Sequence, residues 1–138
     1  MKEIKKLYVQ LKDGTIRECS LEISKSQPLI INYIGPILKK RKIENDDLFN
    51  ALIMLRRELE AEGGNLLCNG ARFDVYPSGM SREMGGGRKA YVLHQGSPAL
   101  RDDLVDILDY SSPEFVGTIK QQEEFYEKWV SSLRKLKK

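Results

Sequence analysis

The residue types with the clearest capacity for chemistry lie in a glycine-rich segment at 77–89. Backbone N–H groups in such a segment can surround an anion, and neighbouring basic side chains can supply positive charge. The candidate anion-binding residues are Ser78, Ser81, Arg82, Gly85, Gly86, Gly87, Arg88 and Lys89. The same pattern is also typical of a mobile connection between two strands or of a loop that contacts a partner.

Known phosphate-binding motifs do not fit this segment. The pattern GxxxxGK[ST] does not occur in the sequence. Residues 85–90 match GxGxxA, but they lead into a predicted strand, whereas that motif requires the N-terminus of a helix at this point. A small enzyme or a phosphate- or nucleotide-binding domain that uses residues 77–89 is thus kept only as the alternative to a protein-binding function.

Other residue types do not favour an enzyme. His94 is the single histidine, and no serine or cysteine lies at a recognised nucleophile spacing. With Cys19 and Cys68 as the two cysteines, a tetrahedral zinc site is one ligand short. A disulfide between them stays open, although free thiols in a reducing cytosol are the simpler interpretation. We expect no catalytic residues, no metal and no cofactor.

Acidic residues are concentrated in one part of the chain. Residues 102–127 contain eight Asp or Glu and one Lys, whereas residues 63–101 contain five basic and two acidic residues. Such a distribution can steer a basic partner toward the acidic side, with aromatic residues as anchors. Scatter of charges over an ordinary surface would look the same. The candidate partner-binding residues are Asp102, Asp103, Asp106, Asp109, Tyr110, Phe115, Glu123, Glu124 and Glu127.

Basic runs at 39–42 and 134–138 raise a nucleic-acid binder as a third hypothesis. Neither run contains an aromatic residue, and the net charge is only +3, so we expect no nucleic-acid partner. The longest apolar stretch, 28–38, is interrupted by polar residues, glycine and proline. It is also shorter than the ~20 residues of a membrane-spanning helix. The N-terminus lacks a signal-peptide pattern, and we expect a cytoplasmic protein without a membrane segment.

Predicted strands carry or flank many of these candidate residues. Alternating apolar residues predict strands at 4–11 and 15–23. A three-residue loop at 12–14 would place Leu7 opposite Cys19 and put Gly14 at a left-handed position. Further strands are predicted at 65–69, 72–76 and 89–95, and a strand is preferred to a helix at 103–110. The isoleucine-rich segment 29–42 is compatible with a helix that begins after Pro28 and is broken or kinked at 35–36.

Two helices complete the predicted domain. Residues 45–62 begin with cap-forming Asn and Asp, carry leucines at helical spacing and end at two glycines. A second helix begins at Thr118, which forms a capping-box pattern with Gln121. It should bury Phe125, Trp129 and Leu133 and leave the acids at 123, 124 and 127 toward solvent. The 138 residues fit one domain, 1–138, of the α+β class with a mainly antiparallel sheet.

Two stretches resemble a known group of proteins. They are LLCNGARFDVYPSGMSREMGGGRKAY at 66–91 and VGTIKQQEEFYEKW at 116–129. This C-terminal half resembles small, mostly uncharacterised bacterial immunity proteins of polymorphic-toxin and contact-dependent inhibition systems. The resemblance implies a cytoplasmic protein that neutralises a toxin domain by direct binding. It brings no catalytic signature, so it assigns no role to an individual residue.

Overall fold

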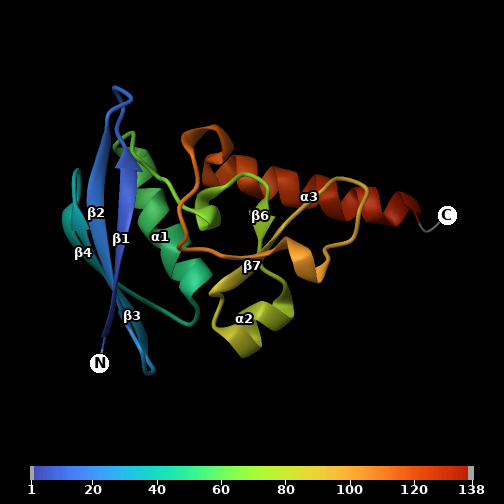
Figure 1. Cartoon of the computed structure of the whole chain (residues 1–138), viewed down its shortest axis with the longest axis horizontal. Helices are drawn as coiled ribbons and strands as arrows, with labels where there is room; N and C mark the ends of the chain where they lie inside the picture. The colour runs from blue at the N-terminus through green and yellow to red at the C-terminus, as the bar shows by residue number, and fades with distance from the viewer. Residues whose placement is uncertain (1, 137–138) are drawn as a thin grey trace.

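A curled antiparallel sheet packed against one helix forms the first half of the molecule (Figure 1). The structure is a computed structural model that describes residues 2–136. The elements of this half are β1 (Lys2–Gln10), β2 (Ile16–Ser24), β3 (Leu29–Gly35), β4 (Lys39–Asn45), α1 (Leu48–Ala61) and β5 (Asn65–Leu66). The five strands have the order β4-β3-β2-β1-β5, and the predicted α+β class is confirmed.

The first hairpin has the predicted register. Leu7 lies opposite Cys19, and both face the core. Gly14 has a φ of 90°, the left-handed conformation that the three-residue loop requires. Asp13 stabilises the loop, since its Oδ1 accepts hydrogen bonds from the backbone N–H and the hydroxyl of Thr15 at 2.9 and 2.6 Å.

The helix considered for residues 29–42 is wrong, because this segment forms the hairpin β3–β4. Ile31 and Tyr33 alternate into the core, which is the period of a strand and suits β-branched isoleucine. The Gly-Pro pair at 35–36 is the start of the turn rather than a kink. The Tyr33 hydroxyl donates to the carbonyl oxygen of Pro36 at 2.7 Å and holds this turn against the sheet.

Helix α1 covers the inner face of the sheet, as its leucine spacing predicts. Asp47 caps the helix, because its side chain accepts from the backbone N–H of Asn50 at 2.7 Å. The leucines at 48, 52, 55 and 59 are all buried. The helix ends before Gly63, whose φ of 82° lies in the left-handed region that favours glycine.

The second half is a small sheet with two helices (Figure 1). Its main elements are β6 (Val75–Tyr76), α2 (Gly79–Gly85), β7 (Lys89–Val92), β8 (Leu104–Asp106) and α3 (Ile119–Leu136), with short 3-10 turns at Asn69–Ala71, Arg101–Asp103 and Pro113–Phe115. The strands are shorter than predicted, because isolated bridges and turns replace their ends. The predicted connection at 77–88 contains α2, which Ser78 caps and which ends at Gly86 with a φ of 64°.

The long C-terminal helix begins where the sequence predicts. Thr118 Oγ1 accepts from the backbone N–H of Gln121 at 3.0 Å, and Gln121 Oε1 accepts from the N–H of Thr118 at 2.8 Å. This reciprocal capping box is therefore confirmed. No helix among residues 2–136 is both long and apolar enough to cross a membrane.

A buried arginine joins α1 to the second half. Arg56 Nη1 donates to Gln122 Oε1 at 2.7 Å and to the Gly70 carbonyl at 3.2 Å, while Nη2 donates to the Gly117 carbonyl at 3.1 Å. Burial lowers the pKa of this guanidinium. Gln122 Nε2 in turn lies 2.9 Å from the carbonyl oxygens of Gly70, Arg72 and Val75. One side chain from α1 and one from α3 thus fix the loop 69–76 between the helices.

We expect Gln122→Leu to lower the free energy of unfolding by about 3 kcal/mol. The change takes an acceptor from a buried charge and a donor from buried carbonyls. The matched control is Glu123→Leu, one residue along on the exposed side of α3, which should change stability by less than about 0.5 kcal/mol. Urea unfolding of both variants measures the difference, and equal effects would contradict this role of Gln122.

Candidate functional site

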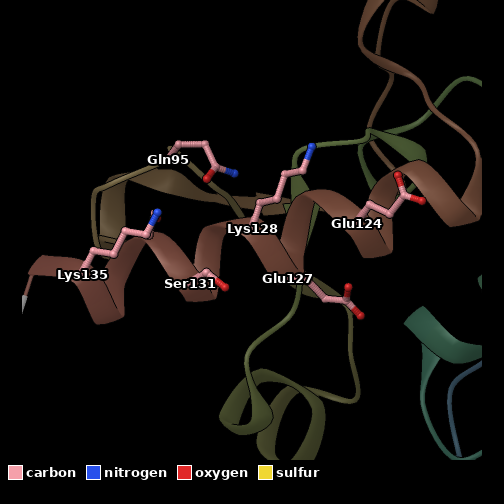
Figure 2. Close-up of a pocket in the computed structure, with 7 residues that line it drawn as sticks. Gln95, Glu124, Glu127, Lys128, Ser131 and Lys135 are labelled. Carbon is pink, nitrogen blue, oxygen red and sulfur yellow. The ribbon is translucent and has the colours of Figure 1, made fainter.

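The predicted acids of α3 lie on the solvent side, as expected from the helix period. Glu123, Glu124 and Glu127 are all exposed. Figure 2 shows Glu124 and Glu127 on a shallow polar surface along the helix, which also carries Lys128 and Lys135. The surface of α3 is therefore mixed in charge rather than uniformly acidic.

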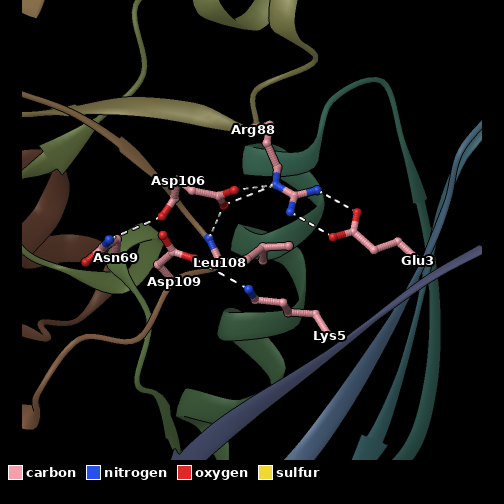
Figure 3. A network of polar contacts seen from close by, with 7 residues as sticks. All are labelled: Glu3, Lys5, Asn69, Arg88, Asp106, Leu108 and Asp109. Carbon is pink, nitrogen blue, oxygen red and sulfur yellow. Dashed lines mark hydrogen bonds and ion pairs between the residues drawn. The ribbon is translucent and has the colours of Figure 1, made fainter.

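The predicted acids at 102–109 do not form one free patch. Figure 3 shows Arg88 between two carboxylates: both Nη atoms donate to Glu3 of β1 at 2.8 and 2.9 Å, and Nε donates to Asp106 of β8 at 3.0 Å. Asp109 lies 3.4 Å from Lys5 Nζ. These pairs join the two sheets, so Asp106 and Asp109 have structural partners already.

The remaining predicted partner residues are spread over the surface. Asp103 accepts from the backbone N–H of Leu100 at 2.9 Å and lies 3.3 Å from His94 Nε2, whereas Asp102 is exposed. Tyr110 is 57% exposed and makes an edge contact with Tyr8. Phe115 is 39% exposed and lies under the guanidinium of Arg72. Their roles in partner binding stay predictions.

The predicted anion-binding residues do not converge on a cradle. Arg82 donates to Asp47 Oδ2 at 3.2 Å and to Asn50 Oδ1 at 2.9 Å, and Arg88 is held by the carboxylates described above. The N–H of Gly87 donates to the Ser81 carbonyl at 3.0 Å, and that of Arg88 to the Gly85 carbonyl at 3.3 Å. Ser78 and Ser81 bond to each other's backbone, the Gly86 carbonyl accepts from Leu48, and Lys89 is exposed. The geometry gives these groups internal partners and does not favour the alternative.

Residues 39–42, on β4, and residues 134–136, at the end of α3, lie at opposite ends of the molecule (Figure 1). Residues 39–42 are exposed on β4, an edge strand on which lysines discourage pairing with another sheet. Arg134 and Lys135 are exposed near the end of α3, and residues 137–138 of the second run lie outside the described residues. The two runs therefore do not form a single surface for a nucleic acid.

Both cysteines are buried and free. Burial raises the pKa of the Cys19 thiol to about 12 and that of Cys68 to about 11. Both therefore stay protonated at neutral pH, where only the thiolate is nucleophilic. Among residues 2–136, no three His, Cys, Asp or Glu side chains come together in a way that could hold a metal ion.

A groove that sequence analysis missed lies between α3, the small sheet and the segment 93–99. It has a volume of about 400 Å³. Its principal lining residues are Tyr76, Tyr91, Leu93, Pro98, Tyr126 and Trp129, and the other lining residues, at 77–79, 99 and 133, are also uncharged. We call this feature the aromatic groove.

Stacked rings give the aromatic groove a rigid wall. The rings of Tyr76 and Tyr126 stack with their centroids 4.0 Å apart, and Trp129 stacks on Tyr126 at 6.0 Å. Trp129 Nε1 donates to the Ser97 carbonyl at 2.8 Å, which ties the helix to the segment 93–99. Tyr91 pairs with Tyr76 across the small sheet. The groove therefore combines residues from β6, β7 and α3.

A few exposed apolar side chains are neighbours of residues that line the aromatic groove. Met80, which follows the lining residue Gly79 on α2, is 71% exposed. Leu100 follows the lining residue Ala99, and Leu104 pairs with Tyr91. Both leucines are exposed as well. A groove lined by aromatic rings, with exposed apolar side chains next to it, is typical of a surface that another molecule covers.

No local signal in the sequence predicts this groove. Trp129 and Leu133 follow a helical stripe, and we expected them to be buried, but both are only partly buried. The tyrosines at 76, 91 and 126 lie on three separate elements with no regular spacing. The only hint is the number of tyrosines and prolines between residues 76 and 129.

We expect neither thiol to react with iodoacetamide in the folded protein at neutral pH. Both should react once the chain is unfolded in urea, because burial in the folded protein is the main cause of their raised pKa values. Mass spectrometry after alkylation counts the modified thiols in each state. Rapid labelling of either cysteine without denaturant would contradict its burial.

We expect Glu3→Gln to lower the stability by about 0.5–1 kcal/mol at neutral pH, because Arg88 loses a carboxylate partner. Arg88 holds the pKa of Glu3 below its usual 4.5. The contribution of the Glu3–Arg88 ion pair to stability is therefore complete above pH 4.5 and is lost as the pH falls through the lower pKa that Glu3 has in the folded protein.

Urea unfolding at neutral and at acid pH measures this dependence. The difference between wild type and Glu3→Gln should shrink toward zero in acid. The control Glu44→Gln, an exposed glutamate on β4, should show no such trend. A difference that is constant with pH would exclude the ionised pair as its cause.

Comparison with known proteins adds no assignment. No protein-family model matches this chain, and no curated protein is significantly similar to it in sequence. The aromatic groove and the exposed acids are therefore the features from which a function must be inferred.

Proposed function

We propose that this chain is a protein-binding domain whose contact surface is centred on the aromatic groove. The observation that carries the proposal is the groove itself: stacked rings, with the exposed Met80, Leu100 and Leu104 next to lining residues in the chain or in the sheet. Tyr, Trp and Met are enriched at protein interfaces, where rigid rings bury a large area at a small cost in side-chain entropy.

The chemistry of the lining residues supports binding rather than catalysis. Rings, prolines and small residues provide apolar contact area and a few hydroxyl groups. Arg82 and Arg88, near the small sheet, are engaged in ion pairs that join this half of the molecule to Asp47 and to Glu3 of β1, and Arg88 also pairs with Asp106. The buried thiols are protonated at neutral pH because their pKa values are raised.

The specific form that we propose is a bacterial immunity protein, which neutralises a toxin domain in the cytoplasm by direct binding. Its support is the resemblance of residues 66–91 and 116–129, which include much of the groove. The exposed acids of α3 and Asp102 supply negative charge that would attract a basic toxin domain. One helix thus carries steering charges on its outer side and anchoring rings toward the groove.

We expect the product of the gene adjacent to this one to bind the chain, and growth to be restored when the two are co-expressed. Trp129→Ala should then raise the dissociation rate more than tenfold, because central aromatic anchors dominate binding energy. Tyr110→Ala, which removes an exposed ring elsewhere, is the control. Surface plasmon resonance measures both rates. A complex that depends on Tyr110 or Phe115 and not on Trp129 would contradict the groove as the contact surface.

Changes to the acids of α3 should affect association of the partner, whereas Trp129→Ala should affect dissociation. Glu123→Lys with Glu127→Lys should slow association several-fold and reduce its salt dependence, with little change in dissociation. Glu44→Lys with Glu62→Lys reverses two exposed acids elsewhere and should leave the kinetics unchanged. Equal behaviour of the two double variants would show that the α3 acids do not steer the partner.

A further inference from the structure

We propose that the aromatic groove binds a proline-rich segment in the polyproline II conformation. This inference rests on the proposed protein-binding function and names the part of the partner that the groove receives. Three properties of the groove carry it: a rigid aromatic wall, free hydroxyl groups and the absence of charge among its lining residues.

The rigid wall favours an equally rigid ligand. Tyr76, Tyr126 and Trp129 hold one another by stacking, and the Trp129 indole is also anchored by its hydrogen bond to Ser97. A polyproline II segment is preformed before it binds. Contact between two preformed surfaces avoids most of the ordering entropy that a flexible peptide would lose.

The polar groups of the groove complement a proline-rich backbone. The hydroxyls of Tyr76, Tyr91 and Tyr126 take part in no hydrogen bond within residues 2–136, and none of them is sealed from solvent. They are thus available as donors. A polyproline II helix has no internal hydrogen bonds, so its carbonyl oxygens are free to accept, and proline has no N–H that would need an acceptor.

The charge of the groove distinguishes this ligand from others. Within the described residues, 2–136, no charged side chain lines the groove. The Arg82 guanidinium lies 5.6 Å from the ring centroid of Tyr76, and Asp47 and Asn50 hold it in place. Single-stranded nucleic acids also stack on aromatic rings, but they require a positively charged groove. A neutral groove fits a neutral ligand.

The single tryptophan of the chain makes a direct test possible, because Trp129 reports on the groove. The probe is an acetylated and amidated decaproline peptide, with a Gly-Ser peptide of equal length as control. Decaproline should shift the emission of Trp129 in a saturable way, and the Gly-Ser peptide should not. Tyr91→Phe and Tyr126→Phe keep the rings and remove one hydroxyl each. Each should weaken binding about two- to tenfold, the effect of one neutral hydrogen bond.

The control variant is Tyr8→Phe, which removes a hydroxyl on β1 outside the groove and should bind decaproline as wild type does. Far-ultraviolet circular dichroism verifies that each variant is folded. No emission change at millimolar decaproline would overturn the assignment, as would equal binding of the Gly-Ser peptide or tighter binding of a leucine-rich amphipathic helix. If a partner still depends on Trp129 in that case, the protein-binding function stands and only the ligand class is wrong.

Discussion

The arrangement of this molecule depends on one buried charge. The Arg56 guanidinium lies in the interior and is satisfied by carbonyl oxygens of the backbone and of Gln122 rather than by a carboxylate. A buried charge is costly unless every donor has a partner, so its acceptors must be held in place. Loop 69–76, the start of α3 and helix α1 are therefore fixed relative to one another. The aromatic groove lies on that framework, since Tyr76 leaves the loop and Tyr126 follows Gln122 by one helical turn.

The parts of the fold that follow local rules could be predicted from the sequence. Loop length and the parity of apolar residues determine the register of β1 and β2, and Gly14 provides the required turn. Leucine spacing and capping residues locate both long helices within a few residues. The helix prediction for segment 29–42 is wrong because it treats the Gly-Pro pair as a kink within a helix, whereas the pair begins a turn between two strands. Ile31 and Tyr33 are buried on the same face, as alternate residues of a strand are. This burial depends on the neighbouring strand β2 and therefore cannot be recognised from the segment by itself.

The candidate site was much less predictable, because it depends on partners distant in the sequence. Counting charges at 102–109 correctly found a group of acids but could not show that Arg88 and Lys5 engage two of them. Nor does composition place Arg82 against Asp47, which removes it from the expected anion site. The aromatic groove unites side chains from three elements, so its residues become neighbours only after the chain has folded.

The Glu3–Arg88 ion pair has a consequence for how the chain is made. It joins residues 85 positions apart, and strand β5 also reaches β1 only after the whole β2–α1 region. A nascent chain therefore leaves the ribosome with one side of β1 covered by β2 and the other side open. Closure of so long a loop is slow, and an open strand can pair with another chain. Synthesis through Leu66 thus supplies the last strand of the five-stranded sheet, and only later synthesis supplies Arg88, which ties Glu3 of β1 to the second half of the molecule.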